Sequence, residues 1–145
     1  MLKNPIAQAI ADEAGAKWRP VPRLFDCCSN WRTRKVETPP PDSGLELVSF
    51  THECGHLATT KAAQQAGKPL SVIEWLATKW GFDAILRHGG TVTEEMRQWQ
   101  ARALMGYLAN EPQSDLVYHA AERVEMAAFL RPYRDLPPLV DDRPR

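Results

Sequence analysis

The sequence predicts a mainly α-helical (α+β) domain with four or five helices and a small N-terminal β element. After residue 42, apolar residues recur at helical intervals between capping and stop signals, whereas prolines between residues 19 and 41 leave room only for short strands. The chain has 145 residues, of which 43% are hydrophobic and 25% charged, as in an ordinary globular domain. We expect one domain over residues 1–136, followed by a proline-rich, charged tail at 137–145 that is disordered.

The N-terminal part is expected to form one helix and two short strands. The helix runs from about Pro5 to Lys17, with Asn4 as its N-cap and a proline at its first position, where no amide hydrogen is needed. Between it and the run Pro39–Pro41, only residues 23–28 and 31–36 read as strands. These two segments form the predicted β element.

Four helices are expected after the proline run. The first begins after a cap at Asp42 or Ser43 and ends at the stop signal of Gly67 and Pro69. The other three each begin at a capping residue. Ser71 with Glu74 starts a helix to about Trp80. Thr93, followed by Glu94 and Glu95, starts one to about Leu108 or Asn110, and Ser114 with Asp115 starts one to about Leu130.

Charge and composition exclude several classes of function. The 18 basic and 18 acidic residues cancel, so nothing attracts the chain to nucleic acid or to an anionic membrane. The sequence contains neither a long apolar run nor a secretion signal, so we expect a cytoplasmic protein. Three cysteines (Cys27, Cys28 and Cys54) are too few for a disulfide framework, and we expect them to be reduced thiols.

The most informative motif lies inside the second expected helix. Residues 52–56 read His-Glu-Cys-Gly-His, which is the pattern H-E-x-x-H. Two histidines four positions apart share one face of a helix, so His52 and His56 can bind one zinc ion. Glu53 is rotated away from this line and can act as the general base on a metal-bound water. Gly55 costs about 1 kcal/mol relative to alanine in the interior of a helix. Its presence would be explained if another backbone or a substrate approaches closely at this position.

A catalytic zinc ion needs a third protein ligand in addition to the two histidines. The extended motif with a third histidine is excluded, because the corresponding position is Ala62. The last helix offers two carboxylates. On a helical wheel, Glu125 lies at the edge of the apolar stripe and Glu122 nearer the solvent side, which favours Glu125 over Glu122. His88 and His119 remain as further alternatives.

The motif and a later segment together resemble a known family. His-Glu-Cys-Gly-His, followed by Glu125 to Phe129 and then Pro132, resembles the ImmA/IrrE-type metallopeptidases, which have a zincin fold. This resemblance implies that Glu125 is a zinc ligand. The stretch from Tyr118 to Leu130 is also similar to the zincin domain of ArdC-type antirestriction proteins, which implies Glu122 instead. Both resemblances imply a protein or peptide substrate, such as a regulator or a protein of a mobile element.

Three functions are compatible with these patterns. The first is a zinc peptidase of the gluzincin type, in which Glu53 is the general base and Tyr118 or His119 stabilises the oxyanion. The second is a zincin-like module that binds metal for interaction or regulation and has no peptidase activity. The third is a structural helical protein with a chance motif. The sequence favours the zinc peptidase.

Overall fold

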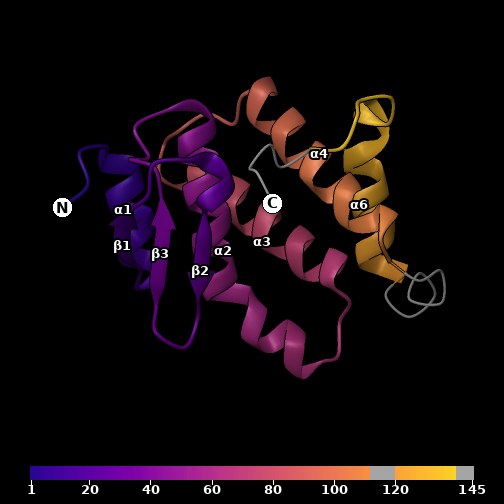
Figure 1. The fold of residues 1–145 in the computed structure, drawn as a ribbon, viewed down its shortest axis with the longest axis horizontal. Helices are drawn as coiled ribbons and strands as arrows, with labels where there is room; N and C mark the ends of the chain where they lie inside the picture. Colours follow the sequence, from indigo (N-terminus) through magenta and orange to yellow (C-terminus); the bar gives the residue numbers. More distant parts are fainter. Residues whose placement is uncertain (112–119, 140–145) are drawn as a thin grey trace.

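The computed structural model describes residues 1–111 and 120–139 of the chain, which form a mainly helical α+β fold. The described helices are α1 (Pro5–Ala14), α2 (Gly44–Gln65), α3 (Leu70–Arg87), α4 (Glu94–Ala109) and α6 (Ala120–Leu130). The strands are β1 (Lys17–Pro20), β2 (Cys28–Asn30) and β3 (Lys35–Thr38), and two 3-10 turns, η1 (Leu24–Asp26) and η2 (Arg131–Tyr133), complete the set. Figure 1 shows α2 and α3 between the N-terminal layer and the α4–α6 pair. This architecture confirms the expected fold class.

The N-terminal layer consists of α1 and a three-stranded mixed sheet. The strand order is β1-β3-β2, with β1 parallel and β2 antiparallel to the central strand β3. The expected strand at residues 23–28 is wrong, because residues 24–26 form the turn η1 and β2 begins only at Cys28. The strand expected at 31–36 is shifted to Lys35–Thr38. The sheet therefore ends in β2, an edge strand that packs beside α2.

Local signals set the helix ends largely as expected. Asn4 caps α1 by accepting hydrogen bonds from the amides of the next turn, and Gly15 ends it three residues earlier than predicted, in a left-handed conformation. Thr93 caps α4 through its side chain. Ser43 occupies the N-cap position of α2, and α6 ends at Leu130. The expected cap at residues 114–115 lies outside the described part of the chain.

The start of α3 differs from its prediction. The helix begins at Leu70, so Ser71 lies inside the first turn and forms no capping box with Glu74. The Ser71 amide and hydroxyl instead donate to the Glu111 carboxylate at 2.6 and 2.8 Å, so a distant side chain caps this end. Glu74 is consequently left to point elsewhere. The helix also continues to Arg87, beyond the expected end at Trp80.

Helices α2 and α3 form the most extensive contact in the fold, and glycines bring their backbones together. A Cβ atom added to Gly55 would lie only 2.9 Å from the Cα and carbonyl carbon of Ala77. One added to Gly81 would lie 3.0 Å from Thr51. The close backbone approach that the sequence suggested at Gly55 is thus made by α3. It holds the two helices at a distance where side chains on their facing sides can meet.

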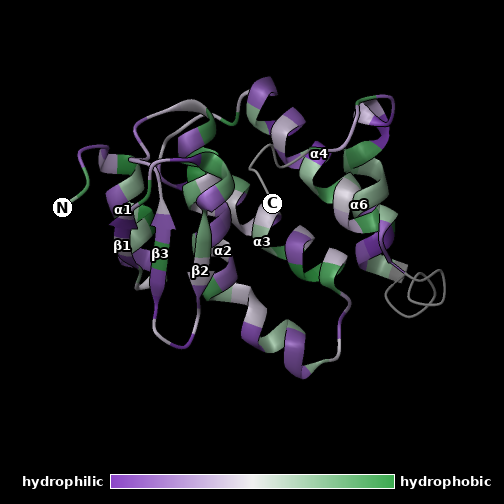
Figure 2. Cartoon of the chain, in the orientation of Figure 1, coloured by the Kyte–Doolittle hydropathy of each residue, from purple (hydrophilic) through white to green (hydrophobic). Residues whose placement is uncertain are grey.

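Two apolar clusters support this central pair of helices. One joins α1, the sheet, α2 and α3 around residues such as Ile10, Val36 and Phe50. The other joins α3, α4 and α6 around residues such as Leu104 and Met126. Figure 2 shows hydrophilic and hydrophobic residues alternating along α4 and α6, as expected of helices that bury one face. Among the described residues, no helix combines the length and the apolar character needed to span a membrane.

Candidate metal site

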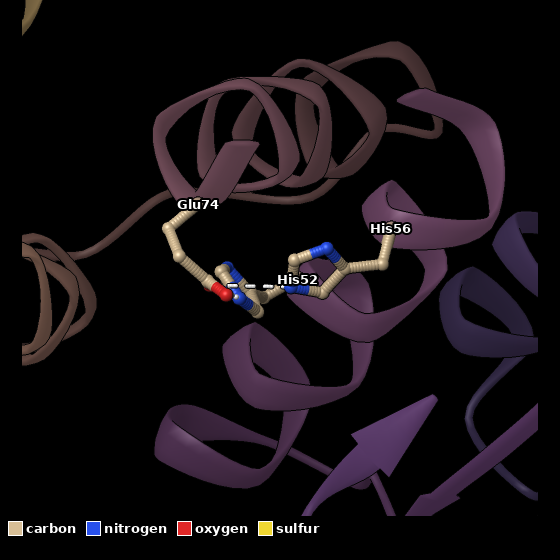
Figure 3. A group of neighbouring side chains, drawn as sticks. All are labelled: His52, His56 and Glu74. Atoms are coloured by element: carbon tan, nitrogen blue, oxygen red, sulfur yellow. Dashed lines mark hydrogen bonds and ion pairs between the residues drawn. The ribbon is translucent and has the colours of Figure 1, made fainter. Parts of the chain in front are cut away.

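Three side chains from the facing sides of α2 and α3 converge on one point. His52 and His56 project from α2, and Glu74 projects from α3 between them (Figure 3). The Glu74 Oε2 atom lies 2.8 Å from His52 Nε2 and 3.1 Å from His56 Nε2. The two imidazole rings are nearly perpendicular, with centroids 4.7 Å apart. Among the described residues, this is the group of histidine, cysteine and carboxylate side chains arranged to hold a metal ion.

The donor set and its spacing fit a zinc ion. Two imidazoles and one carboxylate are an established ligand set of catalytic zinc sites, which keep a fourth position for water. Ligand bonds of about 2.0–2.1 Å in a tetrahedron require donor atoms about 3.3 Å apart. The Glu74 oxygen is within a few tenths of an ångström of this spacing from both histidines, and all three donor atoms lie within 4.8 Å of one another. The residues present therefore fit the metal that the motif predicts.

Buried polar side chains contact the Nδ1 atoms of both histidines, on the side of each ring away from Glu74. His52 Nδ1 lies 3.0 Å from the hydroxyl of Thr78. That hydroxyl donates to the side-chain oxygen Oε1 of Gln100 at 3.3 Å. Since the Thr78 proton is directed at Gln100, its oxygen accepts from His52 Nδ1–H, and Nε2 is left to face Glu74. His56 Nδ1 has a similar partner in the Thr60 hydroxyl at 2.7 Å. Such outer contacts fix the tautomer and the ring orientation of metal-binding histidines.

The electrostatics of the cluster favour a bound cation. Burial opposes ionisation of Glu74, but hydrogen bonds and charge from the two histidines outweigh it and hold the pKa of Glu74 below its usual value. Burial also opposes the charged form of His52, yet the Glu74 carboxylate raises the pKa of that imidazole. The cluster thus combines a buried negative carboxylate with two imidazoles that can donate lone pairs to a cation. A metal ion among the three side chains would balance the charge of Glu74.

Glu53 lies beside the cluster but is not a member of it. Its Oε2 atom accepts a hydrogen bond of 2.5 Å from the Ser29 hydroxyl of the edge strand β2. Ser29 is paired with the buried Val36 of β3, so its side chain shares the sheet face that packs on α2. The sheet therefore positions the Glu53 carboxylate next to the two histidines. This is the place that the motif assigns to a general base.

A groove crosses the candidate site and exposes it on both sides. Two cavities of about 580 Å³ each meet there, and Cys27, Glu53, Glu74 and Tyr107 line both of them. The Tyr107 ring is supplied by α4. Burial, together with the negative charges of Glu74 and Glu53, raises the pKa of Tyr107 to about 12. A tyrosine hydroxyl keeps its proton at neutral pH even without this shift, so Tyr107 can serve as a hydrogen-bond donor.

The structure places the carboxylates expected as third ligand elsewhere. Glu125 accepts from the Trp75 indole at 3.0 Å and pairs with Lys79 at 2.9 Å, on the far side of α3 from the histidines. Glu122 forms an ion pair with Lys68. Glu74 takes the place that the sequence analysis gave first to Glu125 and second to Glu122.

Of the remaining candidates of the sequence analysis, His88 is described and lies away from the site. His88, a further alternative for the third ligand, pairs with Glu13 at 2.9 Å at the far end of α3. Tyr118 and His119 were expected to stabilise an oxyanion, and His119 was also an alternative third ligand. Both residues lie outside the described part of the chain. His52, Glu53 and His56 are where the motif puts them.

One signal in the sequence could have identified Glu74. It lies 18 residues after His56, in the helix that follows after a short turn, and consecutive helices with a short connection pack antiparallel. The alternative use of Glu74 as a capping residue concealed this.

Comparison with protein-family models, with curated proteins and with solved structures finds no match to this chain.

Proposed function

We propose that the protein is a zinc-dependent peptidase in which Glu53 is the general base. The observation that carries this proposal is the convergence of His52, His56 and Glu74 beside Glu53, at the middle of a groove. Bound zinc supplies an acidified water and polarises a carbonyl group. The other parts of the reaction fall to side chains of this chain.

Glu53 is placed to move the proton. The Ser29 hydroxyl engages its Oε2 atom, so we assign proton transfer to Oε1. In this scheme the carboxylate takes a proton from the attacking water and returns it to the leaving amine, as general acid–base catalysis requires. Tyr107, which keeps its proton at neutral pH and lines the groove on both sides of the cluster, donates to the developing oxyanion.

The position of β2 favours a peptide over a small-molecule substrate. Within the described part of the chain, strand β2 is paired only with β3, and Cys28, Ser29 and Asn30 line the groove beside the site. An extended peptide can add to such an edge through main-chain hydrogen bonds, with its scissile bond next to Glu53. The substrate expected from the sequence resemblance is likewise a protein or peptide, such as a regulator.

The test compares the wild-type chain with Glu53→Gln, each loaded with zinc and incubated with a mixed peptide library. We expect Glu53→Gln to keep its zinc and to lose cleavage by about 10²–10⁴-fold, because Gln is nearly isosteric but cannot transfer the proton. Glu95→Gln, which removes an exposed carboxylate from α4, is the matched control and should cleave like the wild type. Products are counted by mass spectrometry.

Three outcomes would contradict the proposal. Full cleavage by Glu53→Gln would exclude Glu53 as the general base. Zinc binding by the wild type without any cleavage would favour the alternative function, a zincin-like module that binds metal for interaction or regulation. Absence of zinc binding would remove both functions.

A further inference from the structure

The two halves of the groove differ in chemistry. On the side of β2 the lining is slightly more polar than apolar, with Ser29, Asn30, Arg32, Thr60 and Gln64 beside Trp31, Leu70 and Ile73. On the side of η1 and α4 it is more apolar than polar and includes Leu24, Phe25, Trp99, Ala103 and Leu104. The candidate metal site lies between these halves. A bound peptide would therefore place its residues on either side of the scissile bond in unlike surroundings.

The apolar half is shaped as a side-chain pocket. The rings of Phe25 and Trp99 face each other at a tilt of 46°, with centroids 6.0 Å apart, at its wall. Leu104 is 1% exposed, so it is packed into the core and gives the cavity a firm apolar surface. The volume of about 580 Å³ falls within the range typical of ligand pockets. Apolar walls of this kind select an apolar side chain because they bury its surface from water.

The chain's own C-terminal segment already borders this pocket. Leu139 is among its lining residues, and its amide donates to the carbonyl oxygen of Arg102 at 3.3 Å. The Arg102 Nε atom donates to the Pro137 carbonyl at 2.8 Å, so the segment is tied to α4 at two points. An irregular segment that carries an apolar residue is thus held at the cavity by hydrogen bonds of its main chain. A substrate peptide offers the same kinds of group.

We propose that this cavity is the specificity pocket of the site, and that it selects substrates with an apolar side chain next to the scissile bond. The inference rests on the proposed peptidase function and adds the class of substrate. Phe25 is its specificity-determining residue, because its ring lies in the turn η1, at the wall that faces Trp99. Arg32 and its neighbours on the polar side do not take part in this selection.

Two metal-binding probes test the pocket without any need for cleavage. N-acetyl-leucine hydroxamate carries an apolar side chain beside a zinc-binding group, and acetohydroxamate lacks that side chain. Their dissociation constants for the zinc-loaded chain are measured by titration calorimetry. We expect the leucine probe to bind about 10-fold tighter or more, the gain expected from burying a leucine side chain. Phe25→Ala should reduce this ratio to about 3-fold or less.

Arg32→Ala is the matched control from the polar half and should leave the ratio unchanged. Leu24→Ala, in the same turn as Phe25, is a second variant whose ratio should also fall, and thermal melts followed by circular dichroism verify that each variant is folded. A ratio near one in the wild type, or one that neither variant lowers, overturns the pocket and leaves the proposed function intact. Failure of both probes to bind the zinc-loaded chain overturns the metal site, and this inference with it.

Discussion

The close crossing of α2 and α3 makes Gly55→Ala a sharp test of the site's architecture. The added Cβ would lie 2.9 Å from both the Cα and the carbonyl carbon of Ala77, whereas ordinary contacts of this kind are 3.4–4 Å. The carbonyl oxygen of Ala77 would be closer still. This obstacle is backbone and cannot rotate away, so the two helices must separate by about 1 Å. Such overpacking typically costs about 1–3 kcal/mol, whereas alanine gains about 1 kcal/mol over glycine in a helix.

A matched control removes the helix-propensity contribution. Gly106 lies inside α4, and the nearest atom to a Cβ added there is 4.0 Å away, so Gly106→Ala should be neutral or stabilising by up to about 1 kcal/mol. The difference in unfolding free energy between the two alanine variants is then the steric cost alone, about 1–3 kcal/mol. Gly81→Ala, where the nearest contact would be 3.0 Å, should fall between them.

The assay is denaturant unfolding of the chelator-treated proteins, followed by a zinc competition titration. Zinc affinity of Gly55→Ala is expected to fall by about 10-fold, because Glu74 lies one turn from Ala77 on the displaced helix. The reasoning is refuted if Gly55→Ala is as stable as Gly106→Ala and binds zinc like the wild type. In that case the helices would not be in backbone contact at this point.

Three further predictions concern single side chains. Glu74→Ala should abolish stoichiometric zinc binding, measured by metal analysis after dialysis, whereas Glu125→Ala should retain it; the reverse result would restore Glu125 as the ligand. Tyr107→Phe should keep zinc and lower the rate of peptide cleavage by about 10²-fold, because it removes the proposed oxyanion donor; an unchanged rate would exclude that role. Burial raises the pKa of Glu111, but hydrogen bonds from Arg123 and Ser71 outweigh it and keep that pKa below its usual value of 4.5. The carboxylate therefore stabilises the fold above about pH 4.5, and this contribution to the free energy of unfolding is lost as the pH falls further. In Glu111→Gln, the decrease in the free energy of unfolding between about pH 7 and pH 3 should be smaller than in the wild type. An unaltered pH profile would contradict the assignment.

The starts of α1, α2 and α4 were predictable because each carries a local signal. Asn4, Thr93 and the proline run before α2 mark helix starts that the structure confirms. The strands were not predictable, since each has only three or four residues, too few for an alternating pattern to stand out. Their pairing also depends on the parallel contact between β1 and β3, which no local signal in the sequence encodes.

Part of the site could be read from the sequence for a similar reason. His52, Glu53 and His56 lie on one helix, so their spacing alone defines their geometry. The third ligand depends on tertiary contacts. Ser71 and Glu74 have the spacing of a capping box, yet Glu111, which lies just after α4, competes for Ser71, and this long-range contact leaves Glu74 to the histidines. Only the fold reveals that exchange of partners.

The position of the three ligand residues along the chain also has a consequence for how the protein folds. His52 and Glu74 are only 22 residues apart, on consecutive helices joined by the short turn Ala66–Pro69. Contacts between residues that are near in sequence form early, because little loop entropy is lost in closing them. The hairpin of α2 and α3 can therefore assemble its ligands before the sheet and α4 dock. A metal ion present during synthesis would then bind a nascent hairpin and guide the later steps of folding.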